Sequence, residues 1–170
     1  MVILAVYFTE VLGSCDENYI EELKSDILDL PAKVETILDE INTVKEFANK
    51  VYTEHDMYFL GRGTDYNVAM EGSLKLKEIS YIHSESYAAG ELKHGSIALI
   101  DKGTPVVAIA TQGKLFEKMV SNMQEVRARG ARVIAITQEG NTEVEKSADR
   151  VIYIPKVDDM FASITAVVPM

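Results

Sequence analysis

The spacing of apolar residues predicts that the first third of the chain is helical. An apolar run from Ile3 to Leu12 predicts a short helix with no polar cap in front of it. A second helix is expected to begin at Asp16-Glu17-Asn18 and to end at Leu28, because Pro31 fits best in the first turn of a following helix. That following helix is predicted from Ala32 to about Tyr52, where apolar residues recur three and four positions apart.

The rest of the chain alternates short apolar runs with helical segments. Strands are expected at 57–60, 86–88, 105–110, 132–136 and 151–154, and helices at 66–82, 115–129 and 144–148. Strands that are apolar throughout and alternate with helices indicate a parallel sheet covered on both faces. Because such crossovers are right-handed, we expect an α/β fold, a three-layer αβα sandwich with a mostly parallel, flavodoxin-like sheet.

The change in pattern near residue 53 predicts two parts. Residues 1–53 are expected to form a helical linker segment, and residues 54–170 the α/β domain. Both ends are apolar, and 161–170 starts like a helix without a polar face or a cap. Natural termini are usually polar and exposed. We therefore expect the chain to continue on both sides; the alternative is a complete small protein whose ends pack.

Charge and composition exclude several functions. The net charge is −10, and such a surface repels nucleic acids and anionic lipid. Cys15 is the only cysteine, and the three histidines lack close pairing, so neither a disulfide framework nor a metal site is expected. The apolar start has no basic residue before it and is too short to cross a membrane. A cytoplasmic protein without metal, nucleic-acid or membrane binding is the resulting expectation.

A glycine-rich turn follows the first predicted strand. Gly61-Arg62-Gly63-Thr64 would lie at the carboxyl end of that strand and just before a helix, where free backbone amides attract anions. Gly-x-Gly is a weak motif, and a tight turn without a ligand explains it equally well. We favour the turn.

The helix after this turn carries two stripes. Its apolar stripe is Val68, Ala69, Gly72, Leu76 and Ile79, and an adjacent flank holds Glu71, Lys75, Glu78 and Ile82. The flank alone is typical of an exposed ladder of ion pairs. A carboxylate beside an ammonium group also suits proton transfer: Glu78 could move a proton between adjacent carbons, and Lys75 could offset the negative charge that develops.

Residues 87–95 supply a third candidate. Small residues and glycines surround Glu91, Lys93 and His94, which is typical of a loop that holds charged side chains against a ligand. Histidine is the side chain that can exchange a proton near neutral pH, which makes His94 a candidate acid or base, although a lone histidine is more often structural.

These residues lie in two longer motifs. Positions 61–83 read Gly-Arg-Gly-Thr-Asp-Tyr-Asn-Val-Ala-Met-Glu-Gly-Ser-Leu-Lys-Leu-Lys-Glu-Ile-Ser-Tyr-Ile-His, and positions 85–95 read Glu-Ser-Tyr-Ala-Ala-Gly-Glu-Leu-Lys-His-Gly. This sequence closely resembles the second sugar isomerase (SIS) domain of the glucosamine-6-phosphate synthase family. The resemblance is nearly continuous from Gly61 to Leu99 and weaker to residue 170.

The resemblance implies an activity and partners. In that family a glutaminase domain releases ammonia, and two SIS domains bind fructose 6-phosphate and convert it to glucosamine 6-phosphate without a cofactor. The position matching Glu78 moves the proton between C1 and C2, and the position matching Lys75 assists. The position matching His94 opens the sugar ring from the partner subunit of a homodimer.

Some family features are absent. The phosphate-binding loop belongs to the first SIS domain, and the lysine that forms an imine with the sugar lies in a C-terminal tail beyond Met170. The resemblance therefore implies a catalytic part that is inactive alone. The alternatives are a related SIS-domain sugar-phosphate isomerase or deglycase, and a non-catalytic sugar-phosphate sensor or dimerisation module.

Overall fold

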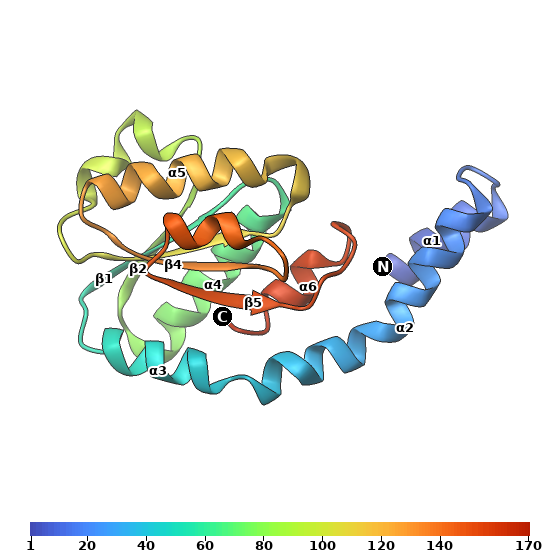
Figure 1. The fold of residues 1–170 in the computed structure, drawn as a ribbon, viewed down its shortest axis with the longest axis horizontal. Coiled ribbons are helices and arrows are strands. Elements are labelled where there is room, and N and C mark those ends of the chain that lie inside the picture. Colours follow the sequence, from blue (N-terminus) through green and yellow to red (C-terminus); the bar gives the residue numbers. More distant parts are fainter.

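A computed structural model describes residues 1–170 as an α/β body with a helical arm projecting from it (Figure 1). The body contains one five-stranded sheet in the order β2-β1-β3-β4-β5, and every neighbouring pair is parallel. The strands are β1 Asp56–Gly61, β2 His83–Ala88, β3 Pro105–Ala110, β4 Arg132–Gln138 and β5 Arg150–Ile154. This order confirms the flavodoxin-like sheet, in which the chain direction across the sheet reverses between β1 and β3.

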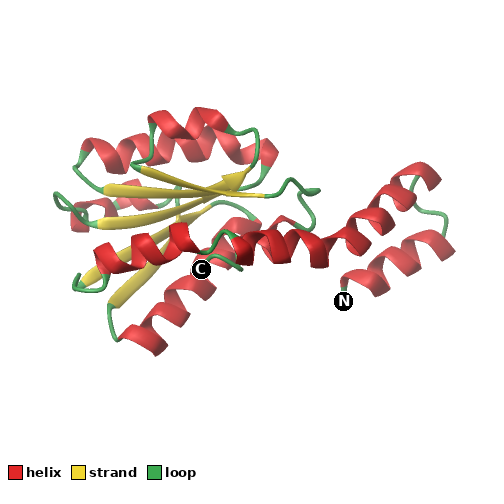
Figure 2. Ribbon diagram, turned by 60° about the horizontal axis from the view of Figure 1, so that its bottom comes forward, coloured by secondary structure: helices red, strands yellow, loops and turns green.

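Helices cover both faces of the sheet (Figure 2). The α-helices are α1 Val2–Val11, α2 Glu17–Asp39, α3 Asn42–Val51, α4 Thr64–Ser80, α5 Phe116–Ala128 and α6 Ala162–Ala166. Four 3₁₀ helices complete the chain: η1 Leu92–His94, η2 Ser96–Leu99, η3 Gly113–Leu115 and η4 Thr142–Lys146. The three-layer αβα sandwich expected from the sequence is therefore confirmed.

Two separate cores explain the uniformly apolar strands. Alternate strand residues such as Leu60 and Val106 pack under α5 and the 3₁₀ helices on one face. Their neighbours Phe59 and Val107 pack under α3, α4 and α6 on the other face. Because successive side chains of a strand point to opposite faces, a strand buried on both sides is apolar at every position.

The helix ends predicted in the first third are wrong in two places. Helix α2 continues through Pro31 instead of ending at Leu28. A proline inside a helix removes one hydrogen bond, but Leu23 on one side of it and Ile37 on the other are both buried in tertiary contacts that hold the helix together. The helix predicted from Ala32 to Tyr52 is divided at residues 40 and 41, and α3 then lies against the sheet.

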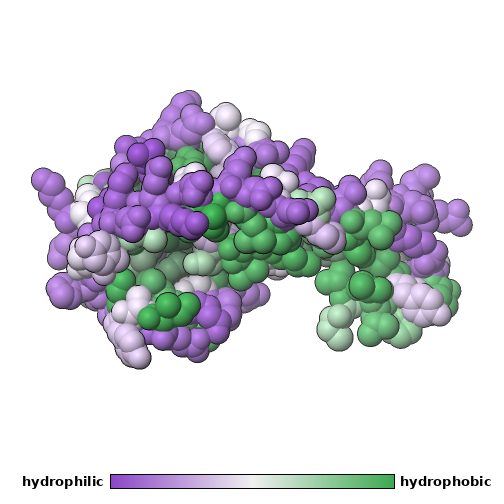
Figure 3. All heavy atoms as spheres, turned by 90° about the horizontal axis from the view of Figure 1, so that it is seen from below, coloured by the Kyte–Doolittle hydropathy of each residue, from purple (hydrophilic) through white to green (hydrophobic).

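The arm consists of α1 and the first half of α2. Its small core joins Val6 of α1, Ile20 and Leu23 of α2 and Phe161 near α6. Most of the other residues of α1 are apolar and exposed, and the apolar surface of the arm is visible in Figure 3. The exposed large apolar residues of α1 and its C-cap are Ile3, Leu4, Tyr7, Phe8, Val11 and Leu12.

Candidate functional site

The turn at Gly61-Arg62-Gly63 joins β1 to α4 through a very close approach of backbone to backbone. A Cβ atom at Gly61 would lie 2.3 Å from the carbonyl oxygen of Asp65, so only glycine fits there. Gly63 has φ +59°, a left-handed conformation that also favours glycine. The N–H groups of Asp65 and Tyr66 donate to the carbonyls of Arg62 and Gly63. The glycines thus have an architectural explanation that needs no ligand.

A buried carboxylate occupies the crevice between the carboxyl ends of β1 and β3. Asp65 is 2% exposed, and its carboxylate accepts hydrogen bonds from Thr111 N (2.8 Å), Thr111 Oγ1 (2.5 Å) and Gln112 N (3.4 Å). Burial raises the pKa of Asp65, and the hydrogen bonds from Thr111 and Gln112 act in the opposite direction. Asp65 therefore fastens the first turn of α4 to the loop after β3.

Two more side chains, those of Asp159 and Gln138, form hydrogen bonds at the same carboxyl ends of the strands. The Asp159 carboxylate accepts a hydrogen bond from Gly113 N, with an oxygen at 3.2 Å. The Gln138 amide donates to Thr111 O and accepts from Val157 N, both at 2.9 Å. The three backbone amides of the loop after β3 are therefore bound by carboxylates of the chain itself. In related open sheets this edge is where anionic ligands bind.

Asp65 is the residue of this edge that the sequence did not reveal. An acidic residue in the first turn of a helix is common, since it complements the positive helix end, and nothing local distinguishes a buried one. Only the parallel pairing of β1 with β3 brings Thr111 to Asp65, across 46 positions of the sequence.

Lys75 and Glu78 lie together in the later turns of α4. Lys75 Nζ is 2.9 Å from Glu78 Oε2 and 3.7 Å from Glu71 Oε1. About half of each side chain of the Lys75–Glu78 pair is exposed, at 49% and 52%. The two groups predicted for proton transfer are thus adjacent and open to solvent.

Lys75 and Glu78 are suited to different chemical roles. The hydrogen bond to Glu78 is the main reason that the pKa of Lys75 is raised above 10.5, and the negative charges of Glu78 and Glu71 add to it. Lys75 is therefore a permanent cation near neutral pH, suited to stabilising negative charge. Glu78 is the group of the pair that can accept a proton.

The stripe and flank predicted for this helix need two corrections. Ile79 is 77% exposed and not part of the buried stripe, whereas Ser73 is buried and hydrogen-bonds to Ser84 at 2.9 Å. Ile82 is not on the flank, because α4 ends at Ser80 and Ile82 is buried next to β2. More of the surface at the end of α4 is therefore exposed to solvent than the spacing of its apolar residues predicts.

His94 lies at the carboxyl ends of the strands, whereas the Lys75–Glu78 pair lies at their amino ends; these two ends of the sheet are called its carboxyl edge and its amino edge. Helix α4 runs from the carboxyl end of β1 to the amino end of β2, so its later turns are at the amino edge. His94 ends η1, which follows the carboxyl end of β2, and it is exposed. The six residues of β2 separate the two edges by roughly 20 Å. Within one chain the structure brings Lys75 and Glu78 together and leaves His94 apart.

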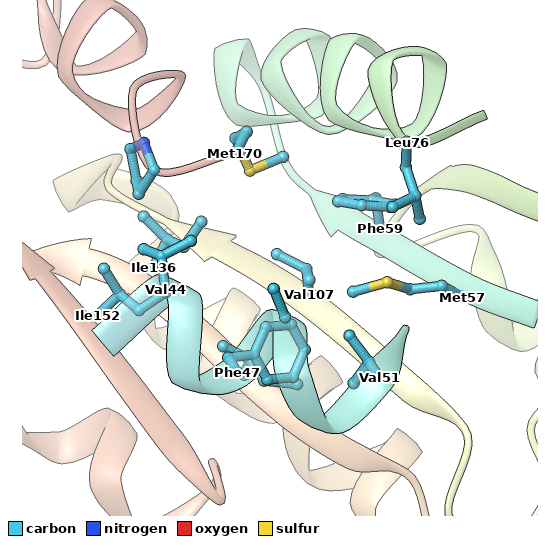
Figure 4. A pocket seen from close by; sticks show the side chains of 13 residues that line it. Val44, Phe47, Val51, Met57, Phe59, Leu76, Val107, Ile136, Ile152 and Met170 are labelled. Carbon is cyan, nitrogen blue, oxygen red and sulfur yellow. The ribbon is translucent and has the colours of Figure 1, made fainter. Parts of the chain in front are cut away.

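A separate pocket opens between α3, α4 and the sheet (Figure 4). It has a volume of about 110 Å³, and 12 of its 13 lining residues are apolar, among them Phe47, Phe59, Val107 and Met170. Figure 4 shows Met170 entering it from the end of the chain. A pocket with so few polar groups suits an apolar chain segment and not a phosphorylated sugar.

Two further features bear on ligands. No group of three or more His, Cys, Asp or Glu side chains is placed where it could bind a metal ion. None of the helices combines the length and the apolar character needed to cross a membrane.

Comparison with known proteins connects this geometry to a family. The SIS domain model matches residues 50–170. The chain is 52% identical to a glutamine–fructose-6-phosphate aminotransferase (isomerizing) of Clostridium tetani over all 170 residues, and 48% identical to one of Thermus thermophilus; in each case it spans 28% of the relative's length.

Solved structures show the same fold. The C-terminal domain of glucosamine-fructose-6-phosphate aminotransferase from Francisella tularensis superposes with a TM-score of 0.91 at 33% identity, covering 98% of this chain and 48% of that one. Tagatose-6-phosphate ketose/aldose isomerase from Escherichia coli, at 21% identity and a TM-score of 0.63 over 83% of this chain and 42% of that one, shares the fold alone. The chain therefore belongs to the SIS domain family.

Proposed function

We propose that this chain is part of the isomerase portion of a glutamine–fructose-6-phosphate aminotransferase, which makes glucosamine 6-phosphate. The observation that carries the proposal is the Lys75–Glu78 pair, held at 2.9 Å on an accessible face of α4. Identity of 45–53% to enzymes of that name, over essentially the whole chain, supports the substrate class. We also propose residues 1–53 as a helical linker segment and 54–170 as the SIS domain.

The proposed chemistry is a proton transfer between neighbouring carbons. Ammonia condenses with C2 of open-chain fructose 6-phosphate. The condensation releases water and leaves an imine at C2. Glu78 then removes a proton from C1, which gives an enaminol, and returns it to C2 while the C1 hydroxyl loses its proton. The product carries an amine at C2 and an aldehyde at C1, and the aldehyde closes to the sugar ring. Lys75, a cation throughout, stabilises the negative charge that builds up between the two steps. No cofactor is required for these steps.

We further propose that the site is completed by a second copy of the chain. His94 lies at the other edge of the sheet from Lys75 and Glu78, so the ring-opening histidine of one site would come from the partner subunit of a homodimer. Such an arrangement produces two identical sites related by a two-fold axis.

The phosphate group of the sugar is proposed to bind outside this chain, in the first SIS domain of the full-length protein, which would also carry a glutaminase domain. The loop after β3 supports this division, since Asp65 and Asp159 already accept from its amides. The chain alone is expected to be inactive, and the complete enzyme to act in the cytoplasm.

The role of Glu78 is tested in the full-length enzyme with ammonia as the nitrogen donor. Glu78→Gln keeps the size of the side chain and removes the base, so the rate of glucosamine 6-phosphate formation is expected to fall by roughly 10²- to 10⁴-fold. Glu117→Gln, an exposed glutamate at the start of α5, is the matched control and should retain the wild-type rate. Undiminished turnover in Glu78→Gln would refute the assignment.

Shared sites are tested by mixing two inactive subunits. Glu78→Gln and His94→Ala chains with different tags are co-expressed, and the mixed dimer is purified on both tags. One of its two sites then has both Glu78 and His94 intact, so about half of the wild-type activity is expected. If both residues of a site came from one chain, every site in the mixed dimer would lack one of them and no activity would return.

A further inference from the structure

The loop that carries His94 is fastened to the body at two points on either side of Gly90. Ala89 N donates to Gly61 O at 2.9 Å, which continues the pairing of β1 with β2 by one residue. Leu92 is 2% exposed and belongs to the core beneath α5. Between these two points the chain turns at Gly90, and His94 follows two residues after Leu92.

Arg62 lies directly against this turn. Its Nη1 donates a 2.8 Å hydrogen bond to Asn122 Oδ1 on α5, and Asn122 is 4% exposed. Asn122 Nδ2 donates in turn to Glu125 Oε2 at 3.3 Å. The half-buried guanidinium group is therefore held in one place between the end of β1 and α5.

A side chain at Gly90 would force the guanidinium group of Arg62 to move. A Cβ atom at Gly90 would lie 2.9 Å from Nη1, 3.0 Å from Nη2 and 3.2 Å from Cζ of Arg62. The φ angle of Gly90 is not in the left-handed region, so its backbone conformation is open to other residues. The close contact of a side chain at this position would therefore be with the guanidinium group and not with the backbone of the turn.

We propose that Arg62 is a positioning residue for His94, acting through its contact with the Gly90 turn. This inference rests on the proposed function, in which His94 reaches the site of the partner subunit. A residue that acts across an interface must be placed within a fraction of an ångström, and an error of about 1 Å can cost roughly 100-fold in rate. The guanidinium group fixes the distance between the Gly90 turn and the end of β1. Because Leu92, the first residue of η1, is packed in the core, the position of the turn also fixes the position of His94 at the end of η1.

The contact is tested first by single and double substitutions in the full-length enzyme. Gly90→Ala and Arg62→Ala are each expected to lower kcat by roughly 10- to 100-fold with little change in KM, because substrate contacts are not altered. The double variant should be no slower than Arg62→Ala, since the added methyl group meets nothing once the guanidinium is gone. Arg129→Ala, at an exposed arginine that caps the end of α5, is the control. Unchanged kcat in both single variants, or losses that add in the double variant, would overturn the proposal.

A second experiment separates positioning from a general effect on folding. In the mixed dimer described above, the Glu78→Gln chain supplies the working His94, whereas the His94→Ala chain supplies Glu78. Gly90→Ala placed on the Glu78→Gln chain should abolish most of the recovered activity, and the same change on the His94→Ala chain should leave it intact. Equal losses from both placements would mean that Gly90 serves only the stability of the fold. If the mixed dimer without Gly90→Ala has no activity, shared sites are refuted, and the double-variant comparison still decides whether Arg62 acts through Gly90.

Discussion

Helix α4 carries two charged groups of residues with opposite properties. At its start, Asp65 is 2% exposed and accepts three hydrogen bonds from the loop after β3. In its later turns, Lys75 and Glu78 contact each other and remain about half exposed. One helix therefore connects a polar crosslink that is part of the fold to an ion pair that is open to a ligand.

The difference shows why burial of a charged group argues against a direct role in this chain. The hydrogen-bonding capacity of Asp65 is used by Thr111 and Gln112, so binding a ligand there would first have to break contacts that hold the first turn of α4 to the loop after β3. Lys75 and Glu78 contribute little to the fold and can change partners freely. We expect substitutions at Asp65 to alter stability, and substitutions at Glu78 to alter activity.

The largest effect on stability is expected for Asp65→Ala. The substitution leaves the buried N–H group of Thr111 and the half-buried N–H group of Gln112 without an acceptor and creates a small cavity, so the free energy of unfolding should fall by about 3 kcal/mol. Urea denaturation followed by circular dichroism measures the change. A loss below about 0.5 kcal/mol, the usual range of surface substitutions, would contradict the crosslink.

A smaller loss is expected for Thr111→Val. Valine has the same shape as threonine and removes only the hydroxyl hydrogen bond to Asp65, while the two backbone donors remain. The free energy of unfolding should fall by about 1.5 kcal/mol, half of the effect of Asp65→Ala. The double variant Asp65→Ala, Thr111→Val should be no less stable than Asp65→Ala alone by more than a few tenths of a kcal/mol. Additive losses would mean that the hydroxyl acts elsewhere.

The pH dependence of stability distinguishes the charge of the Asp65 carboxyl group from its shape, because asparagine has nearly the same shape and does not ionise. Burial raises the pKa of Asp65 above 3.8, so the folded state keeps the proton to a higher pH than the unfolded state. The stabilisation from this difference is complete below pH 3.8 and is lost as the pH rises through the folded-state pKa. The free energy of unfolding of the wild type minus that of Asp65→Asn should therefore decrease with pH above 3.8. An increase over the same interval would show that the hydrogen bonds outweigh burial.

The smallest effect on stability is expected at the other end of α4. Glu78→Gln and Lys75→Met remove an exposed ion pair, so the urea midpoint should be unchanged within experimental error. The Lys75→Met variant should nevertheless lose activity in the full-length enzyme, because it removes the cation proposed to stabilise negative charge on the reacting carbons. A marked shift of the midpoint would show that the pair is structural, and the contrast with Asp65 would then disappear.

Most of the fold was predictable from local pattern, since β1, β3 and β4 are buried along nearly their whole length and read as continuous apolar runs. The errors occur where tertiary contacts override local preference. Pro31 does not end α2, because Leu23 and Ile37 are held by different cores on either side of it. Ile79 is apolar but exposed, because α4 extends past the part of the sheet that would cover it.

The sequence by itself determined the order of strands and helices in the α/β domain and the adjacency of Lys75 and Glu78, and it favoured an architectural turn at Gly61. Spacing of three on one helix makes two side chains neighbours whatever surrounds that helix. Only the tertiary structure decided that Asp65 is buried, that Arg62 touches Gly90, and that His94 lies at the opposite edge of the sheet. These relations follow from strand pairing, which brings together positions as far apart as Tyr58 and Val106 and leaves no periodic signal in the chain.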